Sequence, residues 1–147
     1  MGVSFRDLGL FTDWVRGRGV NMSKPPIGIP ACPGIYAEIH WATHGVRIGE
    51  TGQSLRGKFI HDAQWMEQMH TGTAPESQLR RLRMSDPHPI VVHAAEDGAT
   101  GFEFFIVCSD TRLGETSLRQ DTERFLFDWV RKQPALVDWN RQRSWRG

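Results

Sequence analysis

Residues 33–61 read PGIYAEIHWATHGVRIGETGQSLRGKFIH and combine a strand pattern with the start of a helix. Apolar and polar side chains alternate over 34–41, which predicts a strand with one apolar face. A second strand is expected at 45–49, after a short turn. We therefore predict an antiparallel hairpin in which His40 lies opposite Arg47.

The same alternation divides the hairpin into an apolar face and a polar face. Tyr36, the one tyrosine of the chain, falls on the polar face together with Glu38, His40 and Arg47. We expect this face to be in contact with water, away from the core. Two interpretations stay open: a strand tyrosine with a solvated hydroxyl, or part of a site that handles phosphate.

A helix is expected to follow the hairpin. Ser54 can cap its first turn, and the pattern continues to about His70. Residues 71–89 predict a second short helix and a loop marked by prolines. The expected packed positions of the first helix are Leu55, Phe59, Met66 and Met69.

Residues 90–110 read IVVHAAEDGATGFEFFIVCSD and are expected to form a second hairpin with its tip at 96–98. The segment FEFFIVC, residues 102–108, is the strongest signal of a buried strand in the chain.

Residues 115–134 predict the clearest helix, which ends before Pro134. Ser117 and Gln120 have the spacing of a capping box. Glu123 falls at the margin of the apolar stripe, which suits a metal ligand and equally suits an ordinary boundary glutamate. The expected stripe comprises Leu118, Thr122, Phe125, Leu126, Trp129 and Val130.

Length and composition indicate one globular domain with its own core. The chain has 147 residues, 39% hydrophobic and 24% charged. We expect a helical extension and loop at 1–30, with an amphipathic helix at 4–17, and the main domain at 31–147.

Charge, cysteines and motifs exclude several classes of protein. The net charge of +1 does not indicate a surface coated with positive charge. Two isolated cysteines indicate free thiols, and the absence of a membrane-spanning or signal segment leads us to expect a cytoplasmic protein. The sequence contains no phosphate-binding P-loop, serine-hydrolase elbow or His-Glu-x-x-His zinc motif.

The order of these parts resembles the GIY-YIG nucleases. Gly34-Ile35-Tyr36, Arg47-Ile48-Gly49, a basic helix, a buried strand and a helix with Glu123 follow one another between about Cys32 and Asn140. The resemblance implies an α/β (α+β) fold with a small mixed or antiparallel sheet flanked by helices. It also implies one divalent ion, Mg²⁺ or Mn²⁺, and DNA phosphodiester hydrolysis that leaves 5′-phosphate and 3′-hydroxyl ends.

By position, the resemblance assigns Tyr36 to the first motif tyrosine, Glu123 to the metal ligand and Asn140 to the asparagine that steadies the site. The second motif departs from the family pattern, because Arg47 stands where a tyrosine is usual. The role of the second tyrosine therefore does not transfer. His61 matches the usual helix histidine or tyrosine.

The helix arginine of the family falls at Gly57, between Arg56 and Lys58. We favour Arg56 as the phosphate ligand, because arginine can bind a phosphate with two hydrogen bonds, and Lys58 stays an alternative. The general base is also open. Tyr36 could serve if Arg47 and His61 lower its pKa, or His61 could take the proton itself.

Two functions from different classes follow. The first is a metal-dependent DNA endonuclease of restriction-like, phage-borne or repair type, acting on double-stranded DNA, as a homodimer where both strands of a palindrome are cut. The second is a protein of nuclease fold that binds DNA or a protein partner without cleavage, which the replacement of tyrosine by Arg47 favours. The expected DNA contacts are Lys58, Arg80, Arg81, Arg83, Arg141 and Arg143.

Overall fold

The structure is a computed structural model and describes residues 19–84 and 86–140. The helix predicted at 4–17 lies outside these residues. In chain order the elements are β1 (Val20–Asn21), β2 (Gly34–His40), β3 (Gly45–Thr51), α3 (Leu55–Thr71), α4 (Glu76–Arg81), α5 (Pro89–Asp97), η1 (Ala99–Gly101), β4 (Phe102–Ser109), η2 (Thr111–Gly114), α6 (Thr116–Arg131) and β5 (Val137–Asp138).

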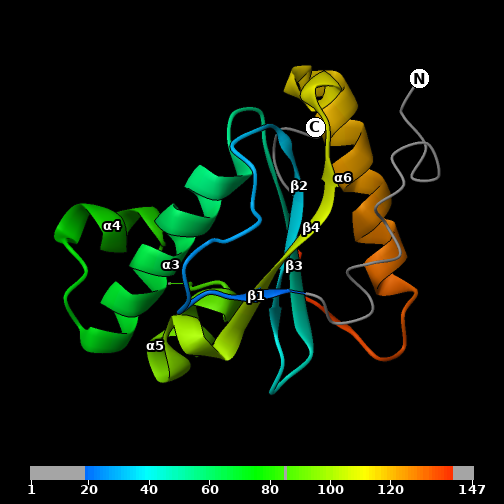
Figure 1. The fold of residues 1–147 in the computed structure, drawn as a ribbon. Helices are drawn as coiled ribbons and strands as arrows, with labels where there is room; N and C mark the ends of the chain where they lie inside the picture. The colour runs from blue at the N-terminus through cyan, green and yellow to red at the C-terminus, as the bar shows by residue number, and fades with distance from the viewer. Residues whose placement is uncertain (1–18, 85, 141–147) are drawn as a thin grey trace.

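The described strands form one mixed sheet in the order β1-β4-β2-β3-β5. Its pairs are antiparallel except for β3 and β5, which run parallel. Helices α3, α4 and α5 lie on one side of the sheet and α6 lies on the other (Figure 1). This arrangement confirms the predicted class, an α+β fold in which a small sheet is flanked by helices. No described helix is long and apolar enough to cross a membrane.

The predicted hairpin is present with a different register. Glu38, and not His40, lies opposite Arg47, so the predicted pairing is wrong by two residues. A shift of two positions keeps every side chain on its own face, because side chains alternate with a period of two. The prediction that Tyr36, Glu38, His40 and Arg47 share one face is therefore confirmed.

Three of the four residues on that face are buried, so the prediction of a wet face is wrong for them, whereas the Arg47 side chain is 21% exposed. Tyr36 is 1% exposed, Glu38 is 0% exposed and His40 is 1% exposed. The reason is topological: β2 lies between β3 and β4 in the middle of the sheet, and helices cover both faces. An antiparallel sheet can leave one face solvated, but here α3 and α5 cover the face that carries Tyr36, Glu38 and His40.

Two apolar clusters fill the two sides of the sheet. Tyr36 and Phe104 pack with α3 and α5 on one side, in a cluster that also contains Met22 and Ile29 from the N-terminal segment. The other side packs against α6 through Ile35, Ala37, Ile39, Val46, Ile48, Leu126, Phe127 and Val130, among others. The N-terminal segment before β2, which was expected to be loop, thus adds strand β1 to the sheet and the side chains of Met22 and Ile29 to the core.

Residues 89–97 form a helix, so the second predicted hairpin is wrong. His88 caps α5, its Nδ1 accepting a hydrogen bond from the backbone N–H of Ile90 at 3.1 Å, and Pro89 occupies the first turn. Ile90, Val91 and Ala94 are buried at helical spacing. The predicted buried strand at 102–108 is confirmed as β4.

Helices α3, α4 and α6 form where they were predicted, with two differences in detail. Ser54 caps α3, with its Oγ accepting from the N–H of Gly57 at 2.9 Å, and α4 is the expected short helix. The capping box of Ser117 and Gln120 is wrong, because Glu115 caps α6 with its carboxylate. Phe125, expected in the packed stripe, is exposed.

Candidate functional site

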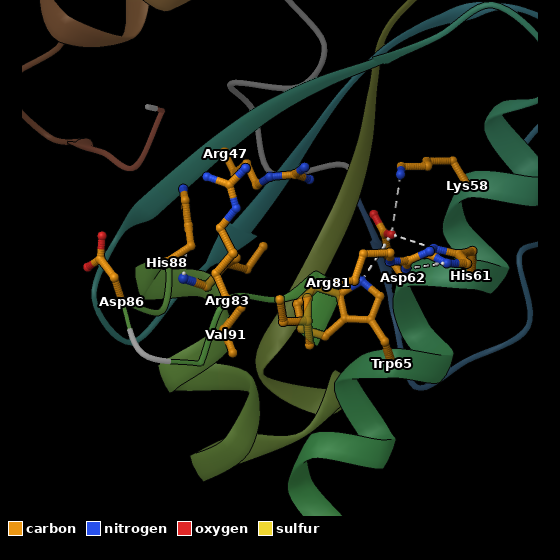
Figure 2. A pocket seen from close by; sticks show the side chains of 12 residues that line it. Arg47, Lys58, His61, Asp62, Trp65, Arg81, Arg83, Asp86, His88 and Val91 are labelled. Carbon is orange, nitrogen blue, oxygen red and sulfur yellow. Dashed lines mark hydrogen bonds and ion pairs between the residues drawn. The ribbon is translucent and has the colours of Figure 1, made fainter. Parts of the chain in front are cut away.

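A pocket of about 420 Å³ opens between β3, α3, α5 and the segment that joins α4 to α5 (Figure 2). Its wall holds four side chains of fixed positive charge and two carboxylates, so its charge favours an anion. The charged and imidazole groups of the wall are Arg47, Lys58, His61, Asp62, Arg81, Arg83, Asp86 and His88.

Helical spacing brings the α3 residues to this pocket. Lys58, His61, Asp62 and Trp65 are three or four positions apart or adjacent, so they share one face of the helix. Figure 2 shows them together on α3, at one side of the pocket. Asp62 is 2% exposed and occupies the buried stripe of the helix, while the His61 side chain is 43% exposed.

The opposite wall includes an arginine in an uncommon backbone conformation. Arg83 has a φ of 53°, in the left-handed region. It follows the end of α4, where its N–H donates to the carbonyl of Arg80 at 3.1 Å. Such a conformation costs a non-glycine residue about 1 kcal/mol or more, and strained residues gather at functional sites. The turn it makes brings Arg83 into the pocket wall.

Two buried carboxyl groups lie behind the basic wall. Asp62 Oδ1 accepts hydrogen bonds from His61 Nδ1 and Trp65 Nε1, both at 3.1 Å, and lies 3.7 Å from Lys58 Nζ. Glu38 Oε1 accepts from Arg47 Nη1 at 3.1 Å. Each acid is thus bound to a cationic or donor group of the pocket wall.

The second oxygens of the two acids are enclosed in the interior. Glu38 Oε2 and Asp62 Oδ2 are buried and have no nitrogen or hydroxyl donor among the described residues. Burial and the neighbouring Asp62 raise the pKa of Glu38 well above its usual value. Burial also acts to raise the pKa of Asp62, but hydrogen bonds from Glu38 and His61 outweigh it and lower that pKa well below its usual value. Glu38 is therefore the carboxylic acid that donates to an ionised Asp62.

Tyr36 is packed too tightly to be a ready base. Its ring stacks on Phe104 with centroids 4.9 Å apart, and any Cβ at Gly49 would collide with that ring. Burial raises the pKa of Tyr36 well above 10, although a hydrogen bond and the charge of Arg47 act against it. Arg47 acts to lower this pKa, as expected, but burial outweighs it, so the net shift of the pKa is upward. Tyr36 instead holds Arg47 as a neutral phenol.

His61 has the protonation pattern of a general base at rest. Its Nε2 lies 2.9 Å from Arg81 Nη2, and since arginine only donates, Nε2 must be the acceptor. Nδ1–H then donates to Asp62. The lone pair of Nε2 is available to a water as soon as Arg81 moves to another acceptor.

The helix cation in the pocket is Lys58 and not Arg56. Arg56 Nε donates to the carbonyl of Ile29 at 3.2 Å and Arg56 Nη2 to that of Pro26 at 3.4 Å. These bonds attach the N-terminal loop to α3, and Arg56 is not among the residues that line the pocket.

Glu123 and Asn140 lie elsewhere. Glu123 is 7% exposed and lies on α6, the helix that covers the other face of the sheet. Asn140 Oδ1 accepts from the backbone N–H of Ile48 at 2.6 Å, at the edge of β3. The structure thus gathers Tyr36, Arg47, Lys58 and His61 but does not bring Glu123 to them.

The remaining predicted DNA contacts divide into two groups. Arg80 is exposed beside the pocket and lines a shallow depression with Arg83. Arg141 and Arg143 lie outside the described residues. Of the predicted contacts, Lys58, Arg81 and Arg83 line the pocket and Arg80 lies beside it.

Sequence reasoning missed the two acids on which the pocket is built. Asp62 stands in the buried stripe of its helix, four residues before Met66 and three after Phe59. A carboxylate among apolar positions was the available signal, because an acid is rarely buried without a partner. Glu38 carried a similar signal, since it alternates with Tyr36 along β2.

Comparisons with protein-family models, with curated proteins and with solved structures find no match to this chain. The GIY-YIG resemblance therefore rests on the sequence motifs, and the functional proposal rests on the pocket.

Proposed function

We propose that this protein is a DNA endonuclease of GIY-YIG type whose phosphate site is the basic pocket beside α3. The observation that carries the proposal is that Arg47, Lys58, Arg81 and Arg83 line one pocket with His61, whose Nε2 lies 2.9 Å from Arg81. Phosphodiester cleavage needs cations to neutralise the phosphate and a base to activate water, and this pocket offers both.

Binding of a phosphate comes first. Arg47 and Lys58 approach from the sheet and α3, and Arg83 approaches from the opposite wall. An arginine can bind two phosphate oxygens at once, and its paired bonds to an anion are stronger than the single bond that Arg81 makes to the uncharged imidazole of His61. A bound phosphate thus attracts Arg81 and releases His61.

The released His61 then takes a proton from the attacking water. The water oxygen bonds to phosphorus and the bond to the 3′-oxygen breaks. The departing 3′-oxygen takes a proton from solvent, so that a 5′-phosphate and a 3′-hydroxyl result. Asp62, which accepts from His61 Nδ1 at 3.1 Å, stabilises the imidazolium that forms. Tyr36 has a positioning role, because it holds Arg47.

The divalent ion implied by the resemblance does not fit this pocket. Its expected ligand, Glu123, lies on α6 across the sheet, and Asp62 is already engaged by His61, Trp65 and Lys58. We derive no step through Mg²⁺ or Mn²⁺. A requirement for either ion stays a prediction of the sequence motifs, as does action in the cytoplasm, which suits two free cysteines.

A second candidate is a protein of the same fold that binds double-stranded DNA, or a protein partner, without cleavage. Three observations favour it: Arg47 replaces a tyrosine, Gly57 occupies the place of the helix arginine, and Tyr36 is buried with a raised pKa. Such a protein would keep the basic pocket as a contact surface.

One assay separates the two candidates. Supercoiled plasmid is incubated with the protein in Mg²⁺ and in EDTA, and duplex binding is measured in parallel. The endonuclease predicts nicked or linear product whose ends can be religated, as expected for a 5′-phosphate. Saturable binding with no product in any buffer supports the second candidate. Neither binding nor cleavage would contradict both.

A further inference from the structure

A second cluster of chemically active side chains lies away from the basic pocket. His40, His93 and Asp97 each offer one ligand atom, and these atoms all lie within 4.8 Å of one another. None of the three lines the basic pocket. His40 is at the end of β2, two residues beyond Glu38 on the same face.

Two elements bring the cluster together. His93 and Asp97 are four residues apart on α5, so they project from the same face of that helix. His40 reaches them from β2, where it is 1% exposed. A pair of ligands at this helical spacing, completed by a third from another element, is a common way to build a metal site.

Each histidine has one ring nitrogen held by a neighbour. His40 Nδ1 lies 2.8 Å from Thr43 Oγ1, and His93 Nδ1 lies 3.0 Å from Glu96 Oε1. Metal-binding histidines ordinarily donate their second ring N–H to such an acceptor, which fixes the tautomer and turns the other nitrogen toward the ion. In His40 and His93 the held nitrogen is Nδ1, so Nε2 of each ring is the nitrogen that could bind an ion.

The rings are also held in place by stacking. The centroids of His40 and His93 are 4.6 Å apart, and His93 stacks on Trp139 at 5.2 Å with an interplanar angle of 6°. Trp139 is held in place in turn, since its backbone N–H donates a hydrogen bond to the backbone carbonyl of Val46 at 3.0 Å. The imidazoles are therefore ordered before any ion arrives.

We propose that His40, His93 and Asp97 bind a transition-metal ion of the Zn²⁺ class, which clamps α5 to the end of the β2–β3 hairpin. Two imidazoles and one carboxylate suit Zn²⁺ and Co²⁺, whereas Mg²⁺ prefers oxygen ligands alone. The Asp97 side chain is 42% exposed, which gives the ion access and leaves a fourth position for water.

The competing explanation is an ion pair without metal. His40 Nε2 lies 2.6 Å from Asp97 Oδ2, and a protonated His40 would satisfy both groups. The ion pair needs neither His93 nor Glu96, whereas the metal site needs His93 as a ligand and Glu96 to orient it. This difference makes the two explanations separable.

The test is a titration with Co²⁺, followed by visible absorption, at a pH of about 7.5, where free imidazole is mostly neutral. The variants are His93→Gln and Asp97→Asn as ligand changes and Glu96→Gln as an orienting change. His44→Asn is the matched control, because His44 is exposed on the same hairpin and asparagine tolerates its left-handed φ of 59°. Circular dichroism verifies that each variant folds, and Zn²⁺ competition gives the Zn²⁺ affinity.

The proposal predicts one Co²⁺ per chain with the intense spectrum of a four- or five-coordinate ion, displaced by Zn²⁺. Folded His93→Gln and Asp97→Asn should each bind at least about a hundredfold more weakly, and Glu96→Gln about tenfold more weakly, while His44→Asn is unchanged. No binding by the wild type, or binding that both ligand variants retain, would overturn the proposal. Should His93→Gln not fold, the Asp97→Asn and Glu96→Gln results decide.

Discussion

Glu38 on β2 and Asp62 on α3 are buried carboxyl groups that act on each other in the interior of the protein. Burial and Asp62 raise the pKa of Glu38, whereas hydrogen bonds from Glu38 and His61 keep the pKa of Asp62 low despite its burial. Arg47 binds the first acid at 3.1 Å, and His61 binds the second at the same distance. Glu38 and Asp62 therefore connect the sheet to α3, the helix that carries His61, the proposed general base. Both the stability of the protein and the arrangement of the pocket depend on the protonation of this pair.

Replacement of Glu38 by glutamine should flatten the dependence of stability on pH. The pKa of Glu38 is raised in the folded state, so its contribution is complete below about 4.3, the unfolded value, and is lost as the pH rises through the folded pKa. Within that window the wild type should lose about 1.4 kcal/mol of unfolding free energy per pH unit from this group. Glutamine keeps the donor to Asp62 without the titration.

Urea unfolding of the wild type and Glu38→Gln between about pH 5 and pH 9 measures this difference. Asp62→Asn is the companion variant. It removes the charge that His61, Trp65 and Lys58 surround, and should cost about 1–3 kcal/mol at neutral pH. If Glu38→Gln has the same slope as the wild type, Glu38 is already ionised in the folded protein and donates no proton to Asp62.

Tyr36→Phe should destabilise the protein by about 1–2 kcal/mol, because the hydroxyl that it removes is buried and binds Arg47. It should also weaken DNA binding, since Arg47 loses its positioning partner. Thermal unfolding and duplex affinity of the same preparation measure both effects. If the variant matches the wild type in both stability and duplex affinity, Tyr36 has no positioning role and is an ordinary residue of the strand.

Gly49→Ala should destabilise by about 3 kcal/mol, because a Cβ at this position collides with the ring of Tyr36. Gly57→Ala is the matched control: its Cβ meets only Ser54 atoms at 3.4 Å or more, within α3. Alanine is the better helix former, so this control should be stabilised by up to about 1 kcal/mol. Equal effects at the two glycines would mean that the Tyr36 packing is wrong.

The double variant Arg81→Glu/Arg83→Glu should weaken DNA binding and reduce the slope of log affinity against log salt by about one unit for each phosphate group that the variant no longer binds. The control is Arg124→Glu/Lys132→Glu, which makes the same change of charge on exposed positions of α6 and its C-terminal end, across the sheet. Slopes that fall equally in both would assign the binding to overall charge and not to the pocket.

The sequence predicted the parts of the fold that depend on local pattern. Ser54 as a cap, the strand at 102–108 and the shared face of Tyr36 and Arg47 follow from capping chemistry and from the two periodicities of backbone structure. The burial of that face could not be predicted in the same way, because it depends on which strands flank β2.

The errors share a physical origin in tertiary packing. Residues 90–94 are short, apolar and partly β-branched, so strand and helix patterns compete, and packing against α3 decides for the helix. Arg56 and Lys58 flank the same motif position, so the sequence alone does not distinguish them. In the fold, Arg56 donates to backbone carbonyl groups of the N-terminal loop. Glu123 was assigned by order along the chain, whereas the side of the sheet that α6 covers is a property of the folded protein.

The most direct test of the central claim is single-turnover cleavage of one defined DNA duplex by the wild type, His61→Ala and His70→Ala. His70 is the matched control, because it is exposed on α3, nine positions after His61 and outside the pocket wall. The proposed mechanism predicts that His61→Ala binds the duplex normally but cuts about a hundredfold to ten-thousandfold more slowly, while His70→Ala cuts at the wild-type rate. Cleavage by His61→Ala at the wild-type rate would contradict it.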